Sequence, residues 1–323
     1  MRQPLIILTG PTAVGKTDLS IRLAKAVGGE IISADSMQVY RRMDIGSAKI
    51  RAEEMEGVPH HLIDILEPEE AFHVARFKEL AAEAVSEIAG RGHIPIATGG
   101  TGFYIQALLY DIDFTENDGK TAIREELERL AVEKGPHFLH QMLEEIDPAS
   151  AEAIHENNIK RVIRAIEFYR QTGGPISLHN QTEREKESPY NFLYYVLTTE
   201  RAELYARIDR RVDQMLKEGL VDEVRALKAS GCHQGLVSMQ GLGYKEILRF
   251  LDGEISLEEA IYILKRDTRH FAKRQLTWFR RERDVCWLDW EKFDWNEDRM
   301  LHWILSDLTE RGIIKKEQIQ SWN

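Results

Sequence analysis

The stretch Gly10-Pro11-Thr12-Ala13-Val14-Gly15-Lys16-Thr17 fits the pattern G-x-x-x-x-G-K-[ST] of a phosphate-binding loop, the P-loop. Residues 5–9 before it predict a buried strand, and residues 18–24 after it begin a helix with a 3.6-residue period. Between a strand and a helix, the N–H groups of such a loop form a nest for a phosphate group. Lys16 adds a positive charge, and the Thr17 hydroxyl can reach a magnesium ion. The loop alone leaves open which phosphate it holds, and whether that phosphate is transferred, hydrolysed or displaced.

The composition is that of an ordinary soluble globular protein. The 323 residues are 43% hydrophobic and 30% charged, enough for one large domain or two smaller ones. We find no run of 18 apolar residues and no leader before the P-loop, so we expect a cytoplasmic protein with no membrane partner. Cys232 and Cys286 are too few for a disulfide framework or a four-cysteine zinc site.

The charge is acidic overall but basic in one segment. The net charge of −11 argues weakly against a nucleic-acid partner. Residues 265–283, however, hold eight Lys or Arg against two acids, and they predict a helix. One stripe of this helix carries Arg269, Lys273, Thr277 and Arg280, and another face that can be buried carries Leu264, Phe271, Gln275 and Trp278. With so few compensating acids, phosphate or RNA contact is favoured over a merely solvated face.

The order of predicted elements indicates an α/β protein. Up to about residue 110 strands at 30–34 and 94–98 alternate with helices at 73–89 and 103–109, which is typical of a parallel sheet. Helices are then expected over most of residues 115–188, followed by a strand at 192–197, further helices over 201–284 and a short strand at 286–288. We therefore expect a P-loop NTPase-like parallel sheet core flanked by helices, formed by residues 1–114 and 191–323. Residues 115–190 would form an all-α insertion domain.

Polar residues follow two further predicted strands at the sheet edge that carries the P-loop. Asp35 follows the second strand, where it can accept a proton or coordinate a metal, although it can equally cap the next loop. Ser36 and Gln38 beside it are suited to reading a base edge. Thr101 lies in a second glycine-rich turn after the third strand. Three histidines, at positions 60, 61 and 73, lack a carboxylate at ligand spacing, so a structural role is favoured for them.

Several long stretches, in one order along the chain, resemble the tRNA dimethylallyltransferase (tRNA isopentenyltransferase) family. They are residues 10–17, 35–40, 44–49, 58–64, 98–104, 241–246 and 273–280. The resemblance covers essentially the whole chain. It implies transfer of a dimethylallyl group from dimethylallyl diphosphate to N6 of the adenosine at position 37 of tRNA, next to the anticodon, giving N6-(dimethylallyl)adenosine and diphosphate.

The resemblance also implies roles for the residues. The P-loop would grip a prenyl diphosphate rather than ATP, and Lys16, Thr17 and a Mg²⁺ held by Thr17 would stabilise the departing diphosphate. Asp35 would accept the N6 proton, and Thr101 would hold the substrates near the same edge. Arg207 would add a diphosphate contact, so the diphosphate site would comprise Gly10, Pro11, Thr12, Ala13, Val14, Gly15, Lys16, Thr17 and Arg207.

The partner implied is the anticodon stem-loop of a tRNA, whose target adenine must leave its stack to enter the site. The insertion, 115–190, would embrace that stem-loop, and a monomer is expected. The residues implied in tRNA contact are Asp35, Ser36, Met37, Gln38, Thr101, Arg124, Ile159, Lys160, Arg161, Val162, Ile163, Arg269, Lys273, Arg274 and Arg280.

Three positions depart from the family pattern. Where the family usually has Gly-Met-Asp-Ile-Gly-Thr-Ala-Lys, this chain has Arg42 in place of the first glycine and Ser47 in place of the threonine. Arg42 alters a turn, whereas Ser47 keeps the hydroxyl. His270 replaces a common glutamine in the basic helix.

Other classes of protein fit parts of the sequence. A small-molecule kinase also couples a P-loop to an aspartate on the next strand, but it needs neither the basic helix nor the helical insertion. A non-catalytic RNA-binding P-loop protein would not depend on Asp35. A free-nucleotide prenyltransferase is nearest in chemistry, and the insertion argues against it.

Overall fold

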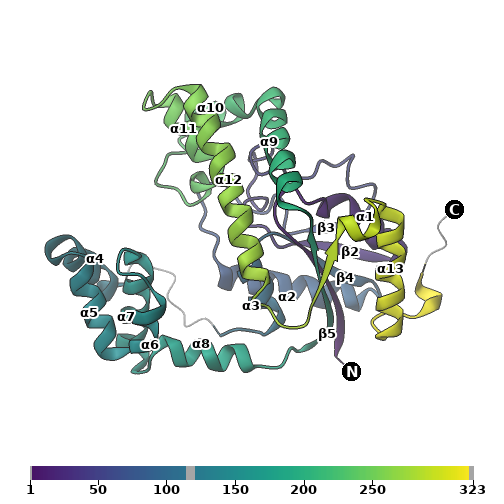
Figure 1. The fold of residues 1–323 in the computed structure, drawn as a ribbon, viewed down its shortest axis with the longest axis horizontal. Helices are drawn as coiled ribbons and strands as arrows, with labels where there is room; N and C mark the ends of the chain where they lie inside the picture. Colours follow the sequence, from purple (N-terminus) through teal and green to yellow (C-terminus); the bar gives the residue numbers. More distant parts are fainter. Residues whose placement is uncertain (1, 114–120, 320–323) are drawn as a thin grey trace. The chain divides into compact units, whose positions relative to one another are not determined.

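The computed structural model describes residues 2–113 and 121–319. Within it, residues 2–109 with 189–319 form one six-stranded parallel sheet and the helices around it (Figure 1). The strand order is β3-β2-β4-β1-β5-β6. The strands are β1 (Gln3–Thr9), β2 (Gly29–Ser33), β3 (His60–His61), β4 (Ile94–Gly99), β5 (Tyr190–Thr198) and β6 (Val285–Asp289). The predicted fold class, a parallel α/β sheet core with flanking helices, is confirmed. The two-residue strand β3 was not predicted, since so short a segment has no periodic pattern.

Strand β1 lies inside the sheet, between β4 and β5, and helices cover both of its faces. Leu5, Ile6, Ile7 and Leu8 are all fully buried, as expected of a parallel strand covered on both faces. Helix α1 (Lys16–Val27) packs with α13 (Glu297–Glu310) on one face. Helix α2 (Val74–Gly90) packs against the sheet and against α3 (Gly102–Leu109).

The remaining helices of this part of the chain follow β5. They are α9 (Arg201–Glu218), α10 (Leu220–Ala229), α11 (Tyr244–Leu251) and α12 (Leu257–Phe279), with short 3₁₀ turns at Ser238–Gln240, Trp290–Phe293 and Lys316–Gln318. Helix α12 contacts α9, α11 and α3 (Figure 1), and its Gln275 bonds to Gly100 of the second glycine-rich turn.

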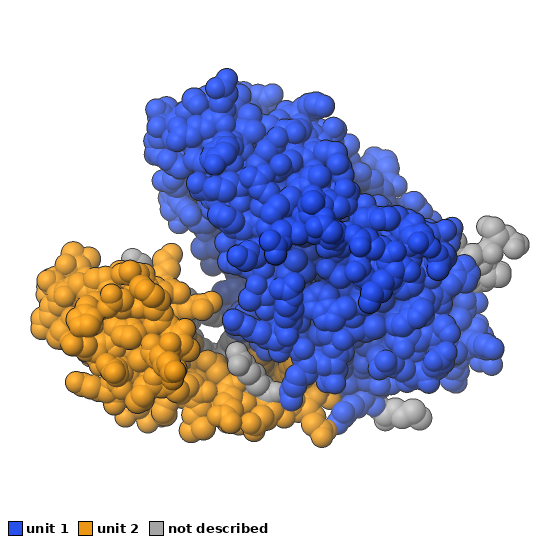
Figure 2. All heavy atoms as spheres, in the orientation of Figure 1, with its two compact units in different colours: residues 1–109, 189–323 blue, residues 110–188 orange. Residues whose placement is uncertain are grey.

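The chain divides into two compact units, residues 1–109 with 189–323 and residues 110–188 (Figure 2). The described part of the second unit contains α4 (Ala122–Lys134), α5 (Pro136–Ile146), α6 (Pro148–Ala153), α7 (Ile159–Thr172) and α8 (Ile176–Glu185). Its core is made of Leu127, Leu139, Leu143, Ala151, Val162, Ile163, Ala165 and Ile166. The boundaries expected from the sequence were 115 and 190. In residues 2–113 and 121–319 no helix is long and apolar enough to span a membrane.

The register of the central strands brings three loops to one edge of the sheet. Thr9 lies opposite Gly99, and Ser33 lies opposite Thr98. The Thr9 hydroxyl donates to the Gly99 carbonyl at 2.5 Å, and the N–H of Ala34 donates to the Thr98 carbonyl at 2.7 Å. Because these parallel strands end at the same level, the loops after them emerge together, where ligands bind in open α/β sheets.

A buried carboxylate near the start of β2 bonds to β3 and to the residues just before β4. Glu30 of β2 is only 3% exposed. Its oxygens lie 2.7 Å from His61 Nε2, 2.7 Å from Arg91 Nη2 and 2.6 Å from His93 Nδ1. Burial alone would raise the pKa of Glu30, but hydrogen bonds from Arg91, His61 and His93 outweigh burial and lower the pKa to about 2.

We predict that Glu30→Gln lowers the free energy of unfolding by about 2 kcal/mol at pH 7, because the amide replaces a charged acceptor of several hydrogen bonds. The difference between the variant and the unchanged protein should shrink as the pH falls from about 4.5 toward 2, since the Glu30 carboxyl becomes protonated first in the unfolded chain and then in the folded one. Urea unfolding at a series of pH values measures this. If the difference in the free energy of unfolding stays constant down to pH 3, the ionised Glu30 carboxylate is not what stabilises the folded protein.

Candidate active site

The P-loop keeps its shape through residues with left-handed backbone. Strand β1 ends at Thr9, α1 begins at Lys16, and φ is +149° at Gly10, +63° at Ala13 and +96° at Gly15. A Cβ atom on Gly10 would lie 2.6 Å from the carbonyl oxygen of Leu197, so only glycine fits there. The loop therefore closes tightly against β5 and opens α1 with free N–H groups.

Lys16 lies inside the loop. Its Nζ donates to the carbonyls of Gly10 at 2.9 Å and Pro11 at 2.7 Å. Burial of the ammonium group, together with repulsion from Arg211, lowers the pKa of Lys16 to about 7, although Asp35 acts in the opposite direction. A bound anion would stabilise the charged form of Lys16.

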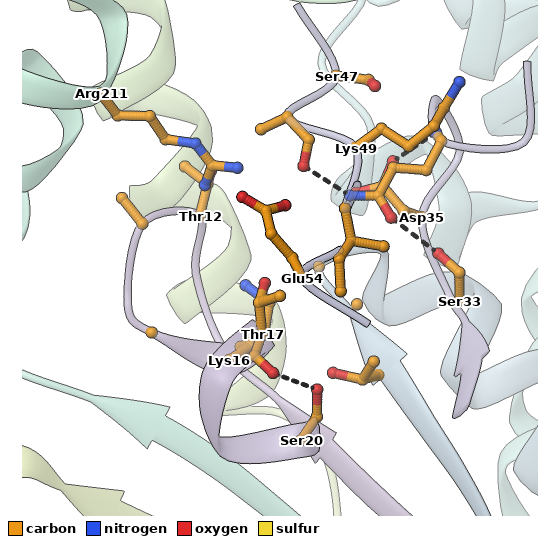
Figure 3. Close-up of a pocket in the computed structure, with 18 of the residues that line it drawn as sticks. Thr12, Lys16, Thr17, Ser20, Ser33, Asp35, Ser47, Lys49, Glu54 and Arg211 are labelled. Carbon is orange, nitrogen blue, oxygen red and sulfur yellow. Dashed lines mark hydrogen bonds between the residues drawn. The ribbon is translucent and has the colours of Figure 1, made fainter. Parts of the chain in front are cut away.

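A cavity of about 690 Å³ opens above the loop. It is lined by residues of the P-loop, of the segments 33–38, 44–51 and 98–100, and of helix α9. Lys16, Thr17, Asp35, Thr12 and Arg211 are among the lining residues drawn in Figure 3. The predicted loop residues and Asp35 are thus brought together at one cavity, which is large enough for a small ligand.

Arg211 is a lining residue that sequence reasoning missed. Its Nη1 lies 3.5 Å from the Thr12 hydroxyl. Burial lowers the pKa of the Arg211 guanidinium, and Asp35 opposes this effect. The signal was present, since Arg211 lies four residues after the predicted Arg207 on the same helix face and both line the cavity.

Asp35 combines the two roles that the sequence left open. Its Oδ1 accepts the N–H groups of Met37 at 2.8 Å and Gln38 at 3.4 Å, which is a turn-forming cap. Its carboxylate also lines the cavity. Among the described residues Oδ2 accepts no hydrogen bond, so one oxygen remains for a ligand.

The neighbours of Asp35 and the second glycine-rich turn contribute unequally. Gln38 lines the cavity, but its amide is already engaged, accepting from Ser33 Oγ and donating to the Ala48 carbonyl, both at 3.2 Å. Ser36 and Met37 are half-buried and are not among the cavity-lining residues. Thr101 also lies outside the lining, although Gly99 and Gly100 belong to it.

The loop at residues 44–51 is fixed by the helices that follow β5. The Glu223 carboxylate accepts the N–H groups of Asp44 at 2.9 Å, Ile45 at 2.7 Å and Gly46 at 3.0 Å. The Tyr244 hydroxyl donates to Glu223 at 2.8 Å. A Cβ on Gly46 would lie 2.6 Å from the Tyr244 ring, so this wall of the cavity depends on both partners.

Lys49 of the same loop is a structural residue. Its side chain is 4% exposed, and its Nζ donates to Asp44 at 2.6 Å, to Asp64 at 2.5 Å and to the Tyr40 carbonyl at 2.6 Å. With its hydrogen bonds made inside the protein, Lys49 is not an available phosphate ligand.

Gln275 of α12 connects the P-loop to the second glycine-rich turn. Sequence reasoning also missed this role of Gln275. Its side chain is 6% exposed. Its Oε1 accepts the Thr12 N–H at 2.9 Å, and its Nε2 donates to the Gly100 carbonyl at 2.8 Å. The sequence placed Gln275 on a face that can be buried, but nothing in it showed that the amide reaches two loops more than 170 residues away.

The expectation that the basic helix lacks acidic partners was wrong, because the acids come from another helix. Arg269 pairs with Asp209 at 2.6 Å, and Lys265 pairs with Asp213 at 2.6 Å, both acids lying on α9. Arg269 is therefore not freely available to RNA. Three predicted RNA contacts do remain exposed, namely Lys273 and Arg274 on α12 and Arg280 directly after it.

Two predicted contacts in the second unit are also corrected. Val162 is 0% exposed and Ile163 is 5% exposed, and both belong to the core of that unit, so their side chains cannot reach RNA. Ile159 is half-buried against the same core. Arg124 pairs at 2.6 Å with the fully buried Glu167. Lys160 and Arg161 are exposed.

The three departures from the family pattern are accommodated. Arg42 has a left-handed φ of +65°, a conformation that favours glycine, and its guanidinium reaches Glu67 at 3.2 Å. The Ser47 hydroxyl donates to the Met43 carbonyl at 2.6 Å, so the hydroxyl has a structural function. His270 is exposed.

The oxygen donors in the cavity suit a magnesium ion that is held mostly by the phosphate oxygens of a bound molecule. In residues 2–113 and 121–319 no cluster of three or more His, Cys, Asp or Glu could hold a metal ion. The Thr17 hydroxyl and the Asp35 carboxylate are hard oxygen donors on the same cavity. Mg²⁺ is commonly held by one or two such groups together with phosphate oxygens and waters, so these residues fit that ion.

Comparison with known proteins gives consistent matches along the chain. A family model described as IPP transferase matches residues 38–282. The tRNA dimethylallyltransferase of Lachnoclostridium phytofermentans is 62% identical over 314 residues, which are 97% of this chain and 100% of that protein. The enzyme of the same name from Carboxydothermus hydrogenoformans is 53% identical over 289 residues, which are 90% of this chain and 93% of that protein.

Solved structures agree with these matches. The full-length tRNA isopentenylpyrophosphate transferase of Bacillus halodurans is 46% identical with a TM-score of 0.71, covering 96% of this chain and 98% of that one. A eukaryotic dimethylallyltransferase acting on tRNA is 30% identical with a TM-score of 0.80, covering 98% of this chain and 82% of that one.

The parallel sheet and its phosphate-binding loop are those of a P-loop transferase. The chain belongs to the IPP transferase family, whose relatives named above are tRNA dimethylallyltransferases. The resemblance drawn from the sequence is therefore confirmed.

We predict that Gln275→Leu raises the KM for the diphosphate substrate about 10-fold and lowers the free energy of unfolding by about 2 kcal/mol, because the Thr12 N–H and the Gly100 carbonyl lose their partner. Gln275→Glu keeps the acceptor for the Thr12 N–H but adds a negative charge beside the diphosphate. Compared with Gln275→Leu, it should therefore raise the KM further and lower the free energy of unfolding less. Steady-state kinetics and urea unfolding measure the two effects. Thr268→Val on the same helix is the control, since it removes only a bond to the helix's own Leu264 carbonyl. Unchanged KM in both Gln275 variants would contradict this role.

We predict that binding of inorganic diphosphate at pH 8 takes up close to one proton at Lys16, whose pKa is about 7 before the anion binds. At pH 6 the uptake at Lys16 should be small, because Lys16 is already charged. Calorimetry in two buffers of different ionisation enthalpy measures it. In Lys16→Arg, whose side chain is always charged, the uptake at pH 8 should disappear. Equal uptake by both proteins would contradict the assignment.

Proposed function

We propose that the protein transfers a dimethylallyl group from dimethylallyl diphosphate to N6 of adenosine 37 in tRNA, releasing diphosphate. The observation that supports this most strongly is the cavity itself. There Lys16 of the P-loop and Arg211 of α9 lie near each other, and the charge of Asp35 acts on both. The cations suit a polyanionic leaving group, and the carboxylate suits an attacking amine that must lose a proton. The names of the relatives support the substrates.

In this proposal the P-loop binds the part of the substrate that leaves. The loop N–H groups, Lys16, Arg211 and Arg207 would hold the diphosphate oxygens, with Thr17 at the metal. Mg²⁺, held by Thr17 and the diphosphate, would neutralise the negative charge that develops as the carbon–oxygen bond breaks. Lys16 would exchange the carbonyls of Gly10 and Pro11 for phosphate oxygens, which restores its full charge.

Asp35 would act on the attacking atom. The N6 lone pair forms a bond to C1 of the dimethylallyl group while the C1–O bond breaks and its electrons leave with the diphosphate. The Asp35 oxygen that is not used in the turn would accept the N6 proton. Because Oδ1 is held by two N–H groups, the carboxylate is already oriented before the substrate arrives.

Exposed basic residues would bind the RNA. These are Lys273 and Arg274 on α12, Arg280 directly after it, and Lys160 and Arg161 in the second unit. Such residues contact phosphates and give affinity, whereas a single-stranded loop supplies sequence readout. We propose that the second unit, residues 110–188, contacts the anticodon stem-loop. The monomeric state and the cytoplasmic location stay predictions.

We predict that dimethylallyl diphosphate labelled in its prenyl group labels unmodified tRNA, while ATP is not consumed and AMP is a poor acceptor. Asp35→Asn should lower the rate of transfer at least about 100-fold with tRNA affinity retained, because the amide oxygen can still accept the Met37 N–H but cannot take a proton. The measurements are single-turnover transfer and tRNA binding.

Glu54→Gln is the matched control, because Glu54 is another carboxylate that lines the cavity and the amide can still accept the Arg51 N–H. It should keep transfer within about 2-fold, the variation expected for a surface substitution of about 0.5 kcal/mol. Consumption of ATP without labelling of RNA would indicate a kinase. Full transfer by Asp35→Asn would contradict the role of Asp35.

A further inference from the structure

Arg207 lies on the wall of the cavity with part of its guanidinium unused. Its Nε donates to Glu203 at 2.9 Å on the same helix. Among the described residues, its two terminal nitrogens make no hydrogen bond. An arginine of this kind can bind a phosphate only if its flexible side chain is held toward the cavity.

A tryptophan far along the chain lies against this guanidinium. The Arg207 Cζ atom lies 4.4 Å from the centroid of the Trp295 ring. This distance is well within the range of a cation–π interaction. Trp295 follows the 3₁₀ turn Trp290–Phe293 and remains 40% exposed, so it is not simply a core residue.

A second tryptophan connects Trp295 to the P-loop. The rings of Trp290 and Trp295 are nearly parallel, with an angle of 4° and centroids 6.0 Å apart. Trp290 is 6% exposed, and its Nε1 donates to the Val14 carbonyl of the P-loop at 2.7 Å. A Cβ on Gly15 would lie 3.4 Å from the same ring. A continuous series of contacts thus runs from Arg207 through Trp295 and Trp290 to the P-loop.

The backbone that carries Trp295 is held in a costly conformation. Asp294 and Trp295 both have left-handed φ, +53° and +57°. Aspartate tolerates this conformation, but for a bulky aromatic residue it is an outlier. The conformation is maintained by the Trp295 N–H, which donates to the Trp290 carbonyl at 3.0 Å, and by an ion pair between Asp294 and Arg299. In this conformation the Trp295 ring contacts both Trp290 and Arg207.

We propose that Trp295 is a positioning residue that holds the Arg207 guanidinium toward the cavity, where it binds the diphosphate of the substrate. The inference rests on the proposed function in its choice of ligand. Trp295 touches no reacting atom and acts through Arg207. Trp290, which is hydrogen-bonded to the P-loop, supports the Trp295 ring. Neither tryptophan was singled out by the sequence, since no periodic pattern or motif includes them.

The test is a double-mutant cycle on the full-length protein, with the affinity for inorganic diphosphate in Mg²⁺ measured by calorimetry. Arg207→Ala should weaken binding about 10-fold or more, as loss of a charged hydrogen bond does. Trp295→Ala should weaken it about 5-fold, and Trp295→Phe, which keeps an aromatic face, should recover most of this loss. In the Arg207→Ala background, Trp295→Ala should cause no further loss.

Transfer kinetics give a second readout. With Trp295→Ala the KM for the prenyl diphosphate should rise while kcat at saturation stays close to that of the unchanged protein. Trp303→Ala is the control, because Trp303 is also 40% exposed but packs on Tyr195 and Phe293 rather than on Arg207. It should change the melting temperature without changing diphosphate affinity.

Two results would overturn the proposal. One is unchanged diphosphate affinity in Trp295→Ala with only a lower melting temperature, which would make the ring purely structural. The other is an equal loss from Trp295→Ala with and without Arg207, which would mean that the ring acts through the P-loop alone. Because the ligand is inorganic diphosphate, these outcomes stand whether or not the prenyl group reaches tRNA.

Discussion

The site depends on two cations, Lys16 and Arg211, that lie close together at one cavity. The Asp35 carboxylate lines the same cavity and attracts both of them. Each cation has a pKa lowered by burial, and repulsion from Arg211 adds to the effect on Lys16. Such an arrangement is unfavourable until an anion enters, which is why it favours the binding of a polyanion. Lys16 meanwhile binds the carbonyls of its own loop. The geometry around it, from the left-handed glycines to Gln275, serves to keep this charge in place.

Helix α12 links that cavity to the surface where we place the RNA. Its buried side carries Gln275, which bonds the P-loop and the turn after β4. Its exposed side carries Lys273 and Arg274, and the exposed Arg280 follows its last residue. A single rigid helix therefore carries both a determinant of the diphosphate site and the basic residues proposed to bind phosphates of tRNA. The same logic applies to α9, where Arg207 and Arg211 line the cavity while Asp209 and Asp213 neutralise bases of α12.

Much of the fold could be predicted because its signals are local. The apolar run of β1 and the glycines of the P-loop predict the core, and Asp35 could be placed at the correct edge because parallel strands end together. The failures concern contacts between distant segments. Arg211 and Gln275 reach the P-loop from helices about 200 residues away or more, and the acids that neutralise Arg269 and Lys265 lie on another helix. Val162 and Ile163 were expected to contact tRNA because of the family resemblance, whereas their own apolar character places them in a core.

If the P-loop holds a leaving group, as we propose, the bond broken joins carbon to oxygen rather than oxygen to phosphorus. The most direct measurement uses dimethylallyl diphosphate with ¹⁸O at the oxygen that bridges C1 and phosphorus, incubated with the enzyme and unmodified tRNA. Mass spectrometry of the products then locates the label. We expect all of the ¹⁸O in the released diphosphate and none in the modified adenosine. Label found in dimethylallyl alcohol, together with phosphate on the RNA, would contradict it.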